Sequence, residues 1–205
     1  MTTRRNILNA STQLFAEKGF RDTSVREICQ LADVNIAAIN YHFGNKAALY
    51  GEVVTRAFAT AGDRSPMPSI AENDDPKESL HAWITWYIDR LFGTGSDLAT
   101  QLVLREAAAP TATLDDLVES QIMPFYSQLE RVVVNLLPPN PDPATTKLHC
   151  LSILGQCLMH RTNKAMIDRL PVEPPDLTLD LDQLVKHIYE SSTAALASTH
   201  AKRAT

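Results

Sequence analysis

Apolar residues recur at helical spacing along most of this 205-residue chain, and that periodicity constrains its fold more than any other feature. Sustained two-residue alternation between hairpin turn signals is missing from the sequence. The pattern therefore predicts an all-α protein of about nine helices. The length is sufficient to bury a core without metal or disulfide cross-links.

Two short helices are predicted at the start of the chain. The first is expected over about 4–18, because one apolar stripe runs through it and Gly19 follows as a C-terminal cap. The second is expected to begin at Ser24, which forms a capping box with Glu27: each side chain can bond the other residue's backbone N–H. A tight turn is expected at 32–35.

Asn35 is a favourable N-cap for a third helix of about two turns, from Ile36 to His42. Gly44 ends that helix. Asn45 then caps a fourth, which is expected from about Lys46 to Ala61.

Prolines and acidic residues divide the rest of the chain. Residues 62–76 are expected to be an exposed loop, the Pro-rich run at 138–143 is expected to stop a helix, and Pro124 is expected to kink one. A proline-rich acidic loop is predicted before the last helix. The further helices are predicted at about 77–92, 97–108, 113–137, 144–169 and 180–198.

Charge is distributed unevenly along the chain, whose net charge is −5. Residues 1–50 carry six Lys or Arg against four Asp or Glu, whereas the remainder carries 13 basic and 20 acidic residues. This asymmetry suits a small nucleic-acid-contacting head on an acidic body.

Three short helices with a four-residue turn between the second and third are the geometry of a helix-turn-helix. Residues 4–50 resemble the DNA-binding domain of the TetR family of bacterial transcriptional regulators. The match holds in register at Ala10, Leu14, Phe15, Ala16, Gly19, Phe20, Thr23, Ser24, Val25, Arg26, Ile28, Ile39, Tyr41, His42, Phe43, Lys46 and Leu49. One departure is Asp33, where the family usually has glycine; Asp tolerates the left-handed conformation that such a position can require.

The resemblance implies phosphate contacts for Tyr41, His42 and Lys46, and a solvated surface is the alternative for each. Arg26 and the Thr23 hydroxyl are further candidates for contacts with the DNA backbone. Base reading is expected from the outward early positions of the third helix, which are Asn35, Ala37, Ala38 and Asn40. Because that helix carries no Lys or Arg, affinity should depend on two heads acting together.

The C-terminal half resembles the CecR-like branch of the family. The resemblance rests on the segment Leu104-Arg105-Glu106-x3-Pro110-Thr111, followed by Leu114, Leu117, Ile122 and Pro124. It implies a helix-turn-helix domain at 1–61 and a ligand-binding and dimerisation domain at 62–205. In such proteins the last helices form a four-helix bundle with those of the second protomer.

Large or adaptable side chains in the second half are candidates for a small-molecule pocket, and core packing is the alternative for each. Arg105 is a candidate anchor for an acidic ligand group, and the adjacent Glu106 is expected to point to another side. The candidate set is Trp83, Trp86, Tyr87, Arg105, Met123, Tyr126, Cys157 and His160.

The three cysteines, Cys29, Cys150 and Cys157, are expected to be reduced thiols. Cys150, Cys157 and His160 share one helical face, which raises a metal site or a redox sensor as alternatives to packing. Without a second cluster of ligands we predict no metal and no cofactor.

The predicted function is that of a ligand-responsive repressor. It would bind a palindromic operator in double-stranded DNA as a homodimer, and a small-molecule inducer would release it. The alternative is a DNA-binding regulator without such a ligand, controlled by a protein partner. Motifs typical of enzymes, such as Gly-x-Ser-x-Gly or His-Glu-x-x-His, are missing. With no apolar run long enough for a membrane span and no signal core, we expect a cytoplasmic protein that is not an enzyme.

Overall fold

The computed structural model of the chain describes residues 3–93, 96–170 and 180–203, and within these ranges it contains helices and turns but no strand. The all-α prediction is therefore confirmed. The helices are α1 Thr3–Asp22, α2 Val25–Ala32, α3 Ile36–Phe43, α4 Lys46–Arg64, α5 Pro76–Phe92, α6 Ser96–Ala108, α7 Thr113–Leu117, a π-helical turn η1 Val118–Ile122, α8 Met123–Leu136, α9 Pro143–Thr162, α10 Lys164–Ile167 and α11 Leu181–Arg203.

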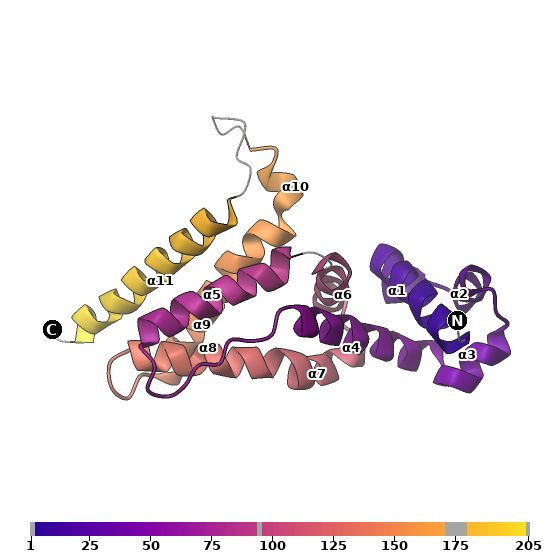
Figure 1. Cartoon of the computed structure of the whole chain (residues 1–205), viewed down its shortest axis with the longest axis horizontal. Helices are drawn as coiled ribbons and strands as arrows, with labels where there is room; N and C mark the ends of the chain where they lie inside the picture. The colour runs from indigo at the N-terminus through magenta and orange to yellow at the C-terminus, as the bar shows by residue number, and fades with distance from the viewer. Residues whose placement is uncertain (1–2, 94–95, 171–179, 204–205) are drawn as a thin grey trace. The chain divides into compact units, whose positions relative to one another are not determined.

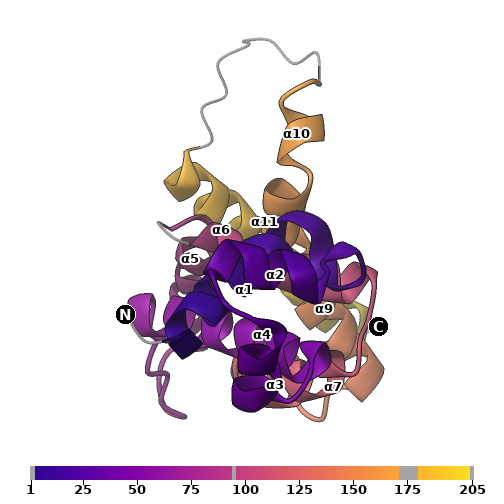
Figure 2. The ribbon, with the colours of Figure 1, turned by 90° about the vertical axis from the view of Figure 1, so that its right-hand side faces the viewer.

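Contacts divide the chain into two compact units. One comprises Met1–Arg64 with Thr94–Ile122, and the other comprises Ser65–Gly93 with Met123–Thr205. In the first unit α1 contacts α2, α3, α4 and α6 (Figures 1 and 2). In the second, α5 lies against α8, α9 and α11 (Figure 1). The predicted domain boundary between residues 61 and 62 stays a prediction.

The first two helices have the predicted ends. Gly19 has φ 84° and ψ 175°, which interrupts α1 where the C-terminal cap was expected. Ser24 and Glu27 form the predicted capping box: the Glu27 N–H donates to Ser24 Oγ at 3.2 Å and the Ser24 N–H donates to Glu27 Oε2 at 2.8 Å. Asp33 has φ 54° and ψ 54°, the left-handed conformation that the departure from glycine suggested.

Asparagine caps the next two helices. The Ala38 N–H donates to Asn35 Oδ1 at 2.9 Å, and the Ala48 N–H donates to Asn45 Oδ1 at 2.9 Å. Gly44 between them has φ 78°, which suits a residue without Cβ. These caps give α3 two defined ends, and the helix is only eight residues long.

Several predicted boundaries were wrong. The predicted helix at 113–137 is divided into α7, η1 and α8, with the break directly before Pro124, and the predicted helix at 144–169 ends at Thr162. Elsewhere α4 continues to Arg64 and α11 to Arg203. The proline-rich acidic loop before α11 falls largely on residues 171–179, outside the described ranges. Among the described helices none is long and apolar enough to cross a membrane.

Candidate nucleic-acid interface

The outer side of α3 is open to solvent. Tyr41 is 85% exposed and Ile36 is 50% exposed. Asn35, Ala37 and Asn40 are also exposed, and Ala38 is half-buried. The residues predicted to read bases therefore lie at the surface of the unit. An exposed tyrosine at the end of so short a helix contributes little packing.

The inner side of α3 joins a small core. Ile39 is 0% exposed and Phe43 is 8% exposed, and Ile28 and Cys29 of α2 are buried as well. Because the apolar side of α3 is used in this way, its opposite side must project outward. The predicted packing roles of these four residues agree with their burial.

Aromatic rings organise the polar end of α3. The rings of Tyr41 and His42 meet edge to face with centroids 5.0 Å apart. The Lys46 ammonium lies 4.5 Å from the centroid of the Phe20 ring, and Lys46 Nζ is 3.5 Å from the Arg21 carbonyl oxygen. Lys46 therefore starts α4 with its charge held beside the end of α1. Phosphate contact by Tyr41, His42 and Lys46 stays a prediction.

Two ion pairs engage other charges of this unit. Lys18 pairs with Glu27 at 2.6 Å and Arg4 pairs with Glu52 at 2.5 Å. The pKa of Glu27 is lowered to about 2 by the bond from Lys18 and by the Ser24 N–H and hydroxyl. Arg26 is exposed on α2, so its side chain is accessible. Its predicted contact with the DNA backbone stays a prediction.

Thr23 differs from its prediction. It is 1% exposed, and its hydroxyl donates to the carbonyl oxygens of Gly19 at 2.7 Å and Leu14 at 3.2 Å. The hydroxyl is used to satisfy carbonyl groups at the interrupted end of α1, and it cannot reach a phosphate in this arrangement. The assignment of Thr23 to the DNA surface is corrected to a structural role.

Arg105 also has a different place from the one predicted. It extends from α6 to the end of α1, where Nε donates to the Ala16 carbonyl at 2.8 Å and Nη2 donates to the Glu17 carbonyl at 2.6 Å. A guanidinium at these carbonyls complements the negative end of the helix dipole. In this structure Arg105 caps α1, and its predicted role of anchoring a ligand stays a prediction.

Glu106 points to another side, as expected, but sequence reasoning missed its partners. It is 0% exposed; Oε2 accepts from the Tyr50 hydroxyl at 2.9 Å, and Oε1 accepts from the Thr111 N–H at 2.7 Å and hydroxyl at 2.8 Å. Burial, with the bond to Glu106 next in importance, raises the pKa of Tyr50. The sequence signal for these partners was the Arg-Glu dipeptide with Thr111 five residues after Glu106.

The predicted ligand residues separate into several environments. Trp83, Trp86 and Tyr87 lie together on α5, with the rings of Trp83 and Tyr87 stacked at 5.0 Å. All three are buried, and Cys157 is 0% exposed. Met123 is 43% exposed, whereas Tyr126 and His160 are half-buried. The aromatic residues of α5 thus pack into a core with Phe125, and ligand contact by any of them stays a prediction.

The cysteines of α9 sit in an apolar environment. Cys150 and Cys157 are each 0% exposed, and burial raises the pKa of each thiol to about 12. Such thiols stay protonated and poorly nucleophilic at neutral pH. Within the described part of the chain, no group of three or more His, Cys, Asp or Glu is placed to hold a metal ion.

Comparison with known proteins identifies this arrangement. Residues 7–53 match the family described as bacterial regulatory proteins, tetR family. Residues 76–196, which are more than half of the chain, match the C-terminal domain of the HTH-type transcriptional dual regulator CecR. The chain therefore belongs to the TetR family of transcriptional regulators and, within it, to the CecR group.

Two relatives are similar over most of the chain. CecR of Shigella flexneri is 28% identical over 178 residues, which are 80% of this chain and 78% of the relative. YttP of Bacillus subtilis (strain 168) is 29% identical over 138 residues, which are 67% of this chain and 63% of YttP. The chain thus aligns with less than two thirds of YttP.

Solved structures share the fold at lower identity. The structure of AibR in complex with isovaleryl coenzyme A and operator DNA has a TM-score of 0.66 and 19% identity, covering 93% of this chain and 97% of that one. A structure of an HlyIIR mutant protein has a TM-score of 0.59 and 21% identity, covering 90% and 95%.

Proposed function

We propose that the protein is a homodimeric repressor that binds a palindromic operator in double-stranded DNA and is released by a small molecule. The observation that carries this proposal is the exposed side of α3, with Tyr41 85% exposed on a helix whose other side is buried. Because an operator is part of the genomic DNA, this function would be carried out in the cytoplasm. We assign it no catalytic activity.

Roles on the DNA follow from side-chain chemistry. Asn40 is suited to pair with adenine in the major groove, and the small Ala37 and Ala38 can approach thymine methyl groups. Tyr41, His42 and Lys46 would contact phosphates beside the groove, and Arg26 would do so from α2. His42, which is half-buried, would donate from its imidazole ring.

Dimerisation is proposed through α9 and α11. The α9 surface exposes Leu148 at 68%, Leu151 at 49% and Met159 at 45%, a run of apolar side chains that a monomer leaves in water. Small residues, Ala194 and Ala195, are exposed on α11. A second copy packing there would form a four-helix bundle and present two α3 helices to one duplex.

Ligand response is proposed to act through α6. Arg105 bonds the end of α1 and Glu106 bonds Tyr50 of α4, so a displacement of α6 moves two helices of the DNA-binding unit together. A ligand must favour one arrangement by differential affinity to have this effect. AibR, whose structure holds both isovaleryl coenzyme A and operator DNA, supports the same combination of ligand and DNA binding here.

The test is operator binding measured by fluorescence anisotropy, with DNA selected by the wild-type protein from a random pool. We expect Lys46→Ala to weaken binding to all sequences alike and to lower the salt slope by about 1. Asn40→Ala should instead relax preference at one position of each half-site, by about 1–3 kcal/mol.

Lys77→Ala is the matched control, because it removes the same charge from an exposed site at the start of α5, a helix that belongs to neither the proposed DNA surface nor the proposed dimer surface. If Lys46→Ala binds the operator as Lys77→Ala does, the proposed DNA surface is wrong. If the protein selects a DNA sequence but no tested compound releases it from that DNA, regulation by a protein partner is favoured.

A further inference from the structure

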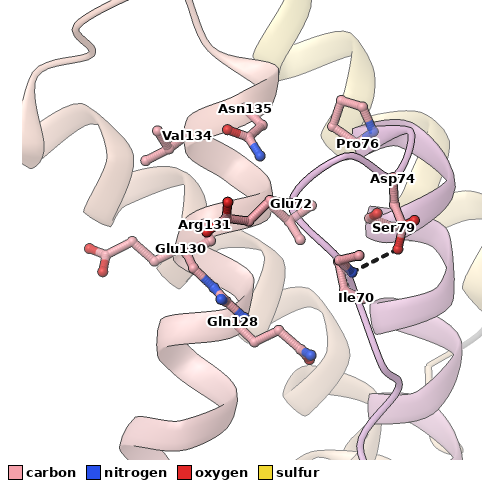
Figure 3. Close-up of a pocket in the computed structure, with 12 residues that line it drawn as sticks. Ile70, Glu72, Asp74, Pro76, Ser79, Gln128, Glu130, Arg131, Val134 and Asn135 are labelled. Carbon is pink, nitrogen blue, oxygen red and sulfur yellow. Dashed lines mark hydrogen bonds between the residues drawn. The ribbon is translucent and has the colours of Figure 1, made fainter.

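A cavity of about 430 Å³ lies between the loop that precedes α5 and one side of α8 (Figure 3). The loop supplies Ile70, Glu72 and Asp74, and α8 supplies Gln128 and Arg131 among others. This volume falls within the usual range of small-molecule sites. The aromatic cluster of α5 does not line the cavity.

The loop wall of the cavity is an ordered turn. The Ala71 N–H donates to Asp74 Oδ2 at 2.7 Å, which is the bond drawn in Figure 3. Directly after it, Asp75 Oδ1 accepts from the Lys77 N–H at 2.7 Å and caps α5. The carboxylates of this wall are therefore held on a fixed backbone.

Gln128 is the unusual residue of this cavity. It is 5% exposed, and its Nε2 donates to the Pro68 carbonyl at 2.7 Å. A carbonyl only accepts, so the amide nitrogen must face it and the amide oxygen must point elsewhere. Among the described residues Oε1 has no hydrogen-bond partner. Figure 3 shows the side chain extending from α8 towards the loop that carries Ile70. A buried amide oxygen without a hydrogen bond is unfavourable, so a donor that reached it would be favoured.

The charges around the cavity select the kind of donor. Among the described residues that line it, Glu72, Asp74 and Glu130 are acidic and Arg131 alone is basic. Ile70, Pro76, Val132 and Val134 add apolar surface. A cationic donor gains more from these carboxylates than a neutral donor does, and an anion would be repelled by them.

We propose that this cavity binds an amphiphilic primary amine in its protonated form. The ammonium donates to Gln128 Oε1 after a small movement that opens the oxygen to the cavity, and it lies in the field of Glu72 and Asp74. The alkyl part covers Ile70 and Val132. Amine binding adds the chemical class of the ligand to the proposed function. Only the release of DNA by the amine rests on the proposed function.

Hexylammonium is the probe, because its amine is protonated at neutral pH. Isothermal titration calorimetry on the full chain at low ionic strength should give a Kd below about 1 mM. Hexyltrimethylammonium has the same charge and chain but no N–H, and it should bind about tenfold more weakly. Added salt should weaken binding of hexylammonium, because the carboxylates of Glu72 and Asp74 are exposed.

Two variants locate the site. Gln128→Met keeps the length of the side chain and removes the acceptor, and it should lower hexylammonium affinity about tenfold. Glu72→Gln changes an exposed side chain without threatening the fold and should lower affinity about threefold, as a partly screened charge does. Glu78→Gln is the control, because it removes an acid from the first turn of α5, close in sequence to Glu72, that does not line the cavity.

Equal binding of both ammonium probes, or unchanged affinity in both Gln128→Met and Glu72→Gln, would overturn the site, as would failure of hexylammonium to bind at about 10 mM. Anisotropy with operator DNA is measured separately. Binding of hexylammonium without DNA release would leave the site standing and refute only its role as a sensor.

Discussion

The helices α3 and α5 both carry aromatic side chains, but they use them in opposite ways. Tyr41 of α3 is 85% exposed, whereas Trp83 of α5 is 0% exposed and its Nε1 donates to the Phe125 carbonyl at 3.3 Å. The burial of Trp83 accounts for its presence, because its ring and its N–H are both satisfied inside the unit. Tyr41 has no comparable packing to account for it. An aromatic residue that contributes little to packing is therefore a better candidate for binding than one that is buried in a core.

The largest effect that would sharpen this contrast is expected from Trp83→Ala. Loss of a fully buried ring with a stacked neighbour should lower the free energy of unfolding by about 3–5 kcal/mol, measured by urea denaturation and circular dichroism. Tyr41→Ala on α3 should change it by less than about 0.5 kcal/mol. Similar losses for the two variants would break the comparison.

A buried polar cluster should give the next largest effect. Glu106→Gln replaces a carboxylate oxygen that accepts hydrogen bonds with an NH2 group, so either Tyr50 or Thr111 loses its acceptor. We expect a loss of about 1–3 kcal/mol in unfolding free energy. Tyr50→Phe combined with Glu106→Gln should cost less than the sum of the two single changes, because they share one hydrogen bond. Strict additivity would show that the bond contributes nothing.

A smaller effect is expected at the start of α2. Ser24→Ala removes the acceptor for the Glu27 N–H and should lower the unfolding free energy by about 1 kcal/mol. Ser24→Asn, which keeps a good N-cap, should recover most of the loss. A stable Ser24→Ala variant would show that the capping box does not help to hold the helix-turn-helix together.

The smallest effect concerns pH. Glu27 has a pKa of about 2 in the folded chain against an ordinary value of 4.5, because its charged form accepts bonds from Lys18 and Ser24. The stabilisation is complete above about pH 4.5 and is lost as the pH falls towards 2. Urea midpoints of the wild type should fall across that window more than those of Glu27→Gln. Parallel curves would contradict the shift.

Local sequence signals predicted the helix-turn-helix well. The capping box of Ser24 and Glu27, the cap at Asn35 and the left-handed Asp33 depend on neighbours within a few residues, so spacing alone reveals them. The break before Pro124 was also visible, although its form as a π-helical turn was not. Helix ends without strong caps, such as that of α4 at Arg64, were predicted three residues short.

Hydrogen-bond partners that lie far apart in the chain could not be predicted from the sequence. The hydrogen bonds of Thr23 with Leu14, of Arg105 with Ala16 and of Glu106 with Tyr50 join residues 9, 89 and 56 positions apart. Nothing in the spacing of a sequence encodes such pairs. Thr23 was therefore assigned to the DNA surface although it is buried, and the hydrogen bonds of Arg105 with α1 were not foreseen. Gln128 was overlooked for the same reason, since Pro68 lies 60 positions away.

Residue type and short spacing were enough to predict the helical class, the caps of the first four helices and membership of the TetR family. Which polar groups are satisfied internally, and which are left for a partner, became clear from the folded structure. That distinction depends on burial, and burial is set by how distant segments pack together.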